Sequence, residues 1–275
     1  MDKLPDNFVF SQSNLQNFMD CALRFKLRYL ERMPWPAPFT LEAQGFEAER
    51  KAGDTIHRLI RGYFEGLDPL SLLNNALLHG ELTEVWLRQV MDAFPLSESD
   101  TYRAELRIDQ TLGGVPATAI YDLVGQESGK VLIIDWKSSS RRPNFRRIRE
   151  SAQKRLFPLV MAAHLQEWQT EYSNLEMTFW ELNFPESSFR FIYNQDLYAA
   201  DLAWFMELTA QIKNLSPEGF QATDDLRKCR YCQYQSYCRR GPAEAPEAKE
   251  DRDEAIDAMI QAGEIEIGDL RVEPL

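Results

Sequence analysis

VLIIDWK, residues 131–137, is the segment from which the architecture of this chain can be inferred. Val131 to Ile134 form a continuous apolar run rich in β-branched residues, as expected for a strand buried on both faces. Successive side chains of a strand point to opposite faces, so Asp135 and Lys137 share one face while Trp136 points to the other. The segment therefore predicts a core strand that ends in a rigidly held, partly desolvated charge pair, which is a favourable place for chemistry.

The segments around this strand predict an α/β sandwich. Two alternating stretches meet at a Gly113-Gly114 turn, and the second continues into the VLIIDWK strand, which makes a three-stranded meander. Apolar periodicity predicts helices before and after the meander. The expected helices cover residues 8–33, 42–64, 70–94, 146–169 and 196–214, and the expected strands cover 102–109, 115–124, 131–137, 175–183 and 189–193.

Composition is typical of a globular protein. The 275 residues are 44% hydrophobic and 12% aromatic, enough to fill a core. The N-terminus lacks an apolar signal region, and no apolar stretch reaches the roughly 20 residues needed to span a bilayer. We therefore expect a cytoplasmic protein with no membrane partner.

Charge is distributed unevenly. The net charge is −12, but residues 243–275 alone hold eleven Asp/Glu against three Lys/Arg, which leaves only −4 for the rest. This stretch is rich in Ala, Pro and Glu, and is either a solubilising acidic tail or an interaction peptide. Residues 137–155 carry eight Lys/Arg against one acid, so the local field suits a polyanion despite the overall sign. The alternative is a solvated basic helix face.

A second carboxylate is expected beside the charge pair. Asp122 lies on the second strand of the meander, and pairing of adjacent strands would bring it to Asp135 beside Lys137. Converging carboxylates without thiols suit a hard cation such as Mg²⁺ or Mn²⁺, while Lys137 would orient a water molecule or stabilise developing charge. This pattern predicts phosphodiester hydrolysis. The alternative is that Asp122 caps a turn and the other two residues form a local ion pair.

The pattern Asp122…IIDWK resembles the catalytic core of the PD-(D/E)XK nuclease superfamily. The resemblance implies a restriction-endonuclease-like core, a mixed sheet flanked by helices. It further implies Asp122 and Asp135 as metal ligands, the backbone carbonyl of Trp136 as a third, and Lys137 as the catalytic lysine. Glu105, on the preceding strand, matches a glutamate that the superfamily often has near the metal.

Within the superfamily the sequence is similar to RecB-type exonucleases, including CRISPR-associated single-strand exonucleases and the nuclease domains of helicase–nuclease complexes. Their histidine on an upstream helix, a catalytic and metal-binding residue, is matched by His57 in GDTIHRL. Their Q-x-x-x-Y motif is matched by Gln153, although Phe157 replaces the tyrosine and removes its hydroxyl. Without the resemblance, the alternative interpretation is that His57 is simply a packed or surface histidine.

Four cysteines form a second candidate site. The spacing C-x2-C-x5-C of Cys229, Cys232 and Cys238, with the remote Cys21, fits an iron–sulfur cluster better than a zinc site, which usually pairs two close doublets. The same pattern resembles the [4Fe-4S] arrangement of the nucleases just named, with Ala22 in place of a common proline. Closing so long a loop costs on the order of 5 kcal/mol in the unfolded chain, so such a clip would contribute comparably to stability.

These observations predict a metal-dependent deoxyribonuclease that acts on single-stranded DNA ends in DNA repair, recombination or CRISPR-type processing. The expected domains are a helical lobe at 1–100 with Cys21 and His57, stapled to a nuclease core and cysteine segment at 101–242, and the tail at 243–275. Trp136, Phe145 and Phe157 are candidates for base stacking. The expected phosphate-binding residues are Arg141, Arg142, Arg146, Arg147, Lys154 and Arg155.

Two rivals remain at this point. One is a catalytically weak nucleic-acid-binding subunit whose acidic tail docks a helicase or a recombination partner. The other is a protein of the same fold stapled by Zn²⁺ at the cysteines. Colour separates the zinc protein from a [4Fe-4S] protein, because only the latter is brown.

Overall fold

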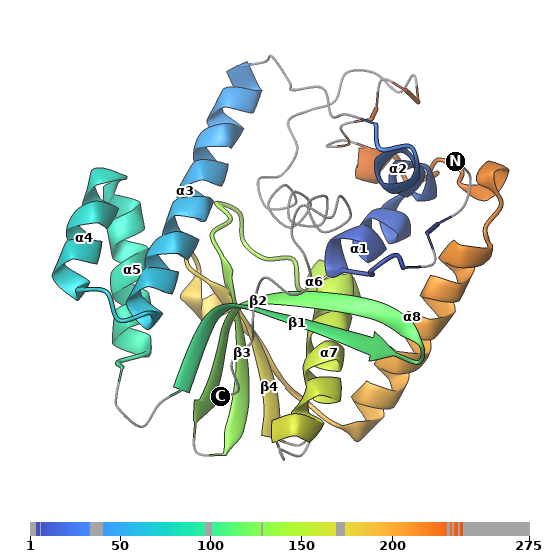
Figure 1. The fold of residues 1–275 in the computed structure, drawn as a ribbon. Coiled ribbons are helices and arrows are strands. Elements are labelled where there is room, and N and C mark those ends of the chain that lie inside the picture. Colours follow the sequence, from blue (N-terminus) through green and yellow to red (C-terminus); the bar gives the residue numbers. More distant parts are fainter. Residues whose placement is uncertain are drawn as a thin grey trace.

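The computed structural model contains a five-stranded mixed sheet with helices on both faces (Figure 1), which confirms the predicted α/β fold. Only the backbone is described for residues 41–51 and 166–168. The described residues are 4–5, 7–33, 41–96, 101–127, 129–168, 174–229, 232, 234–235 and 237–238.

The sheet has the order β1-β2-β3-β4-β5. Neighbouring strands are antiparallel except for β3 and β4, which are parallel. Gly113 and Gly114, both at positive φ, make the tight turn of the β1–β2 hairpin, as a two-residue hairpin loop requires. The strands are β1 Thr101–Leu112, β2 Val115–Glu127, β3 Lys130–Lys137, β4 Leu175–Glu181 and β5 Phe189–Tyr193.

Three of the helices expected from periodicity are each divided, and this corrects their predicted bounds. Gly80, at φ 129°, separates α4 from α5, and the extended backbone of Ser151 separates α6 from α7. Cys21, at φ −163°, separates α1 from α2, and a π-helical turn follows over Lys26–Leu30. The helices are α1 Gln12–Asp20, α2 Ala22–Phe25, α3 Leu41–Phe64, α4 Pro69–Leu78, α5 Glu81–Ala93, α6 Phe145–Glu150, α7 Ala152–Trp168 and α8 Gln195–Asn214.

Residues before α1 are extended rather than helical. The amide of Phe10 donates to the carbonyl of Pro116 at 2.9 Å, and the amide of Thr118 donates back to the carbonyl of Phe10 at 2.8 Å. Ser11 then caps α1 through a capping box with Asn14. The chain therefore bridges to β2 before its first helix starts.

The two faces of β3 pack against two different hydrophobic clusters. Val131 and Ile133 belong to a cluster that includes side chains of α1, α7 and α8, whereas Ile134 and Trp136 belong to a cluster built with α3, α4 and α5. The expected helical lobe of residues 1–100 is thus divided between the two sides of the sheet. Figure 1 shows this division, with α3 to α5 on the left and α1 and α8 on the right.

Among the described residues, no helix combines the length and the apolar character needed to cross a membrane.

Candidate active site

The site lies where the sheet forks. The ladder between β2 and β3 ends at the pair Leu123 and Ile134, and the last residues of β3 pair with β4 alone. Figure 1 shows β1 and β2 bending away from β3 beyond this point as one long hairpin. Asp122 is the first residue of β2 past the ladder, and its Oδ2 accepts a hydrogen bond from the backbone amide of Trp136 at 2.8 Å. The carboxylate therefore bridges the fork.

Helix α3 brings His57 to this fork. Ile56 and Ile60 are buried in the cluster beneath the helix, which holds the neighbouring histidine against the sheet. One turn earlier, a Cβ on Gly53 would lie 3.1 Å from Oγ of Ser138, so the glycine allows α3 to approach the end of β3 closely. The His57 side chain is 11% exposed, and its Nδ1 lies 3.2 Å from Oδ1 of Asp122.

Glu105 completes a three-residue group. It stands opposite Asp122 across β1 and β2, as the register of the pairs on either side requires, and has φ 53°, a left-handed conformation that costs about 1–3 kcal/mol at a non-glycine residue. One ligand atom from each of His57, Glu105 and Asp122 lies within 4.8 Å of the other two. We call these three residues the ligand group.

The donors of the ligand group fit a divalent metal ion. Nδ1 of His57 is buried and makes no hydrogen bond, although a carboxylate oxygen lies close by. Two carboxylates directly opposite each other repel unless a cation lies between them. One imidazole nitrogen with two carboxylates is a donor set suited to ions such as Mn²⁺ and Mg²⁺.

Asp135, Lys137 and Gln153 form a second group beside the first, which we call the lysine group. The Lys137 ammonium contacts Oδ2 of Asp135 and donates to Oε1 of Gln153 at 2.9 Å, while Nε2 of Gln153 donates to Oδ1 of Asp135 at 2.6 Å. Asp135 is only 3% exposed. These three side chains form a closed set of contacts between β3 and α7.

The two aspartates predicted to act together fall into different groups. Among the described residues, the set of converging ligand atoms contains Glu105 rather than Asp135. The two groups are nevertheless adjacent, because Trp136, the neighbour of both Asp135 and Lys137, is the residue whose amide binds Asp122.

Two of the three stacking candidates are buried, which corrects that prediction. Trp136 is 1% exposed and packs against Phe94 and Trp180, while Phe157 is 3% exposed and packs against Tyr121. The periodicity of the chain gave no signal of this burial. Phe145 is 41% exposed.

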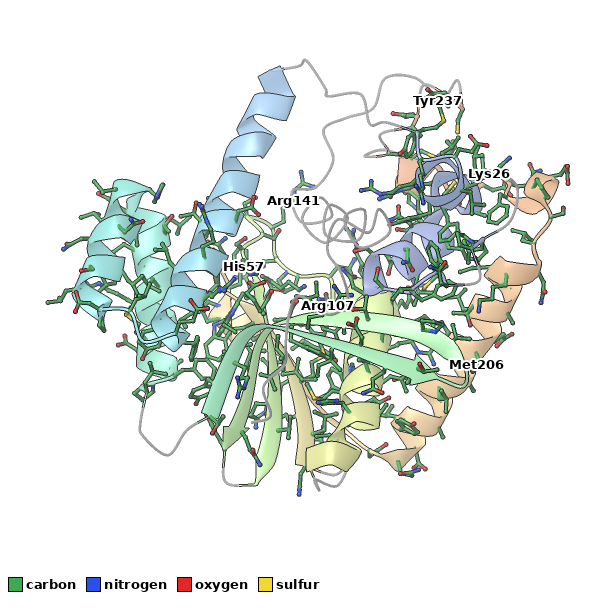
Figure 2. All side chains as sticks on the ribbon, viewed as in Figure 1. Lys26, His57, Arg107, Arg141, Met206 and Tyr237 are labelled. Atoms are coloured by element: carbon green, nitrogen blue, oxygen red, sulfur yellow. The ribbon has the colours of Figure 1, made fainter. Side chains whose placement is uncertain are left out.

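The predicted phosphate-binding residues differ in their surroundings. The four predicted arginines between β3 and the end of α6, Arg141, Arg142, Arg146 and Arg147, are exposed, with Arg142 paired to Glu186 and Arg146 paired to Glu150. Figure 2 shows Arg141 beyond the end of β3, on the side of the molecule where His57 lies. Arg155, by contrast, is held by the buried Asp201 at 2.6 Å.

Lys154 differs from the exposed arginines in another way. Burial lowers the pKa of its ammonium, an effect that Asp201 partly offsets and Arg155 reinforces. The exposed arginines are therefore better placed than Lys154 and Arg155 to meet a polyanion.

The cysteine segment packs beside the break between α1 and α2. All four cysteines are free thiols, and Cys229 and Cys232 are buried. The backbone amide of Thr223 donates to Sγ of Cys21 at 3.4 Å. Burial raises the pKa of the Cys232 thiol, the nearby Cys21 and Cys229 add to this effect, and Arg24 opposes it. The extended conformation of Cys21 thus lies at the point where the N-terminal and C-terminal described segments meet.

Comparisons with known proteins bear on this site. Solved structures similar to this chain include a candidate exonuclease from Eubacterium rectale, 12% identical, with a TM-score of 0.47 over 83% of this chain and 88% of that one. A second is the protein SSO0001, also 12% identical, with a TM-score of 0.39 over 88% and 89% of the two chains. None of the curated proteins matches the sequence. The family model of the PD-(D/E)XK nuclease superfamily matches residues 9–239, and the chain belongs to this superfamily.

Proposed function

We propose that this protein is a metal-dependent exonuclease that hydrolyses phosphodiester bonds at single-stranded DNA ends, in DNA repair, recombination or CRISPR-type processing. The observation that carries the proposal is the ligand group at the fork of the sheet, with the lysine group directly beside it. A half-buried imidazole and two opposed carboxylates suit a cation, and a lysine at the same place suits a reaction that develops negative charge.

The metal ion is Mg²⁺ or Mn²⁺, held by His57, Glu105 and Asp122, with Asp135 and the backbone carbonyl of Trp136 as the remaining protein ligands. Such an ion polarises a phosphate and lowers the pKa of a bound water. The amide of Trp136 fixes the orientation of the Asp122 carboxylate, which supports a ligand role for that residue.

The lysine group acts on the water and on the developing charge. Lys137 is held by two side chains, so its ammonium occupies one position before substrate arrives. Gln153 sets this position by accepting from Lys137 and donating to Asp135. The exposed Arg141, Arg142, Arg146 and Arg147 lie just past β3 along the chain and neutralise the phosphates of the bound strand.

The cysteines hold a [4Fe-4S] cluster that fixes α1 and α2 to the end of the core. The burial of Cys229 and Cys232 and the position of Cys21 beside them support this assignment over two disulfides. The cluster is structural in this proposal. Anaerobically purified protein should be brown and absorb near 400 nm, whereas a colourless protein that contains zinc would contradict the iron–sulfur assignment.

The direct test of the enzyme uses end-labelled single-stranded DNA with Mg²⁺ or Mn²⁺, compared with EDTA. Stepwise shortening that requires metal is expected for the natural protein and is expected to be lost in Asp135→Ala. The control is Arg88→Ala, a change on the exposed face of α5. Undiminished cleavage by Asp135→Ala with a normal fold would overturn the proposed active site.

A second candidate function is a cytoplasmic nucleic-acid-binding subunit that docks a helicase or recombination partner. The acidic residues 243–275, which lie outside the described residues, favour it. Brown, folded protein that binds single-stranded DNA yet releases no product with either metal would support this reading over the enzyme.

A further inference from the structure

Helix α6 contributes no buried side chain to the core. Its six residues read FRRIRE, and an isolated helix this short is unstable in water. Asn144 caps it by accepting hydrogen bonds from the amides of Arg146 and Arg147 at 3.1 and 3.3 Å. Ile148 packs against the main hydrophobic cluster, but the other five residues of α6 are exposed, and their presence is not explained by filling the interior.

A row of aromatic rings connects α6 to the edge of the sheet. The Phe145 ring lies 6.2 Å from that of Phe189 on β5, and the Phe189 ring lies 5.8 Å from that of Phe191. Inward, Phe189 lies 6.4 Å from the buried ring of Phe179 on β4. Phe145 is 41% exposed, while Phe189 and Phe191 are half-buried. The row therefore begins in the core and ends at the surface.

Cations accompany three rings of this row. Arg149 lies 5.7 Å from the centroid of Phe189, and Lys154 lies 4.9 Å from that of Phe191. At the inner end, Nζ of Lys137 lies 5.1 Å from the centroid of Phe179. The same row thus leads from the lysine group to the surface of α6. We call Phe145, Arg149, Phe189 and Phe191 the α6–β5 surface, and the half-buried Lys154 lies behind it.

We propose that the α6–β5 surface binds unpaired bases of a single-stranded DNA end. An exposed ring backed by further rings and accompanied by cations suits a single-stranded nucleic acid, because unpaired bases stack on rings while phosphates meet the charges. A duplex keeps its base faces inside and offers this surface only its backbone. The inference deepens the proposed function, on which it rests, by assigning the preference for single strands to named residues.

Phe145 carries the stacking contact, because its ring is the most exposed of the row and contacts Phe189 alone among the aromatic rings of the described residues. Phe189 supports it from below, with Phe179 and Phe191 on either side. The competing explanation is that these rings and cations only stabilise the edge of the sheet. The two explanations differ in what happens when the bases are removed from the ligand.

The test measures binding in EDTA, so that no cleavage occurs, with three fluorescent DNA ligands: a single strand, the same strand with abasic sites, and a duplex. Phe145→Ala should weaken binding of the base-bearing single strand about tenfold. Binding of the abasic strand and the duplex should be unchanged. Phe145→Trp, which keeps a stacking ring, should restore the affinity.

Ile192→Ala is the matched control, since it removes an apolar side chain that is 60% exposed on the same strand and contains no ring. It should leave all three affinities unchanged. Equal losses for the base-bearing and abasic strands in Phe145→Ala, or no loss for either, would overturn the proposal.

Arg149→Ala tests the charged part of the surface, with Arg88→Ala as its control. Arg149→Ala should weaken base-bearing and abasic strands equally and reduce the salt dependence of binding by about one phosphate contact. A salt dependence identical to that of the natural protein would contradict a phosphate contact at this residue.

These binding results are independent of catalysis. If the protein binds as expected but does not cleave with Mg²⁺ or Mn²⁺, the proposed role of the α6–β5 surface is supported and the proposed enzymatic activity is contradicted. If the protein cleaves but does not discriminate among the three ligands, the proposed enzymatic activity is supported and the proposed role of the α6–β5 surface is contradicted.

Discussion

The ligand group and the lysine group are neighbours in one site, yet they are built in opposite ways. In the ligand group two carboxylates oppose each other and a buried imidazole nitrogen makes no hydrogen bond. In the lysine group one carboxylate, one ammonium and one amide satisfy each other, and the charges balance. The first arrangement suits a cation, whereas the charges of the second balance each other without one. The difference indicates that metal binding and lysine positioning can be disrupted separately.

The largest effect is expected from Asp122→Asn. This change removes a charged ligand and keeps the size of the side chain, so cleavage of single-stranded DNA should fall by at least about a hundredfold. Binding of Mn²⁺, followed by titration calorimetry, should weaken in parallel. The circular dichroism spectrum should remain that of the natural protein, and normal Mn²⁺ affinity in this variant would contradict the ligand role.

A smaller loss of activity, with a large loss of stability, is expected from Lys137→Met. Asp135 would remain buried without its partner, which costs about 3 kcal/mol of the free energy of unfolding. Mn²⁺ binding should be retained, because the ligand group is intact. Chemical denaturation measures the stability and calorimetry measures the Mn²⁺ affinity of the same sample. Loss of both would show that the ligand group and the lysine group depend on each other.

The double variant Asp135→Asn with Lys137→Met sharpens this prediction. Replacing both members of the pair removes the unpaired charge, so most of the stability lost in Lys137→Met should return, while cleavage should be lost as in Asp135→Ala. Additive destabilisation of the two single changes would argue against a direct interaction between these side chains.

The smallest effect is expected from Glu105→Gln in the metal-free protein. Removing one of two opposed carboxylates should raise the free energy of unfolding by about 0.5 kcal/mol, because like charges directly opposite in a sheet repel. The same change should lower Mn²⁺ affinity. Thermal unfolding with and without Mn²⁺ tests both signs, and destabilisation in both conditions would show that Glu105 does not face a cation site.

Much of the fold could be predicted because local patterns and tertiary environment agree. The apolar run of β3, the glycine pair between β1 and β2, and the stripe of α3 each specify one element, and each is found where it was expected. The divided helices could not be predicted in this way. The residues around Cys21 have good helical periodicity, and the extended conformation at that position reflects contacts with a segment about two hundred residues later.

The sequence indicated which residues gather at the candidate site, but not which of them lie together in each group. Asp122, Asp135, Lys137 and Gln153 lie within one small region, as the strand pattern implied. The resemblance pointed to Glu105 near the metal, but it gave no sign that Glu105 rather than Asp135 would join His57 and Asp122, nor of the positive φ of Glu105 in the middle of a strand. The burial of Trp136 likewise depends on α5 and β4, which pack on it from distant parts of the chain.

The contact between Cys21 and the segment around Thr223 also has a consequence for synthesis. The partners of Cys21 leave the ribosome after almost all of the sheet and its helices, because they lie about two hundred residues later in the chain. Contacts between such distant positions form late in folding. A chain truncated before this segment therefore lacks the contacts of Cys21 and α2, whereas α1 still packs with α7 and α8, so proteolysis of such fragments should begin at α2 before it reaches the sheet.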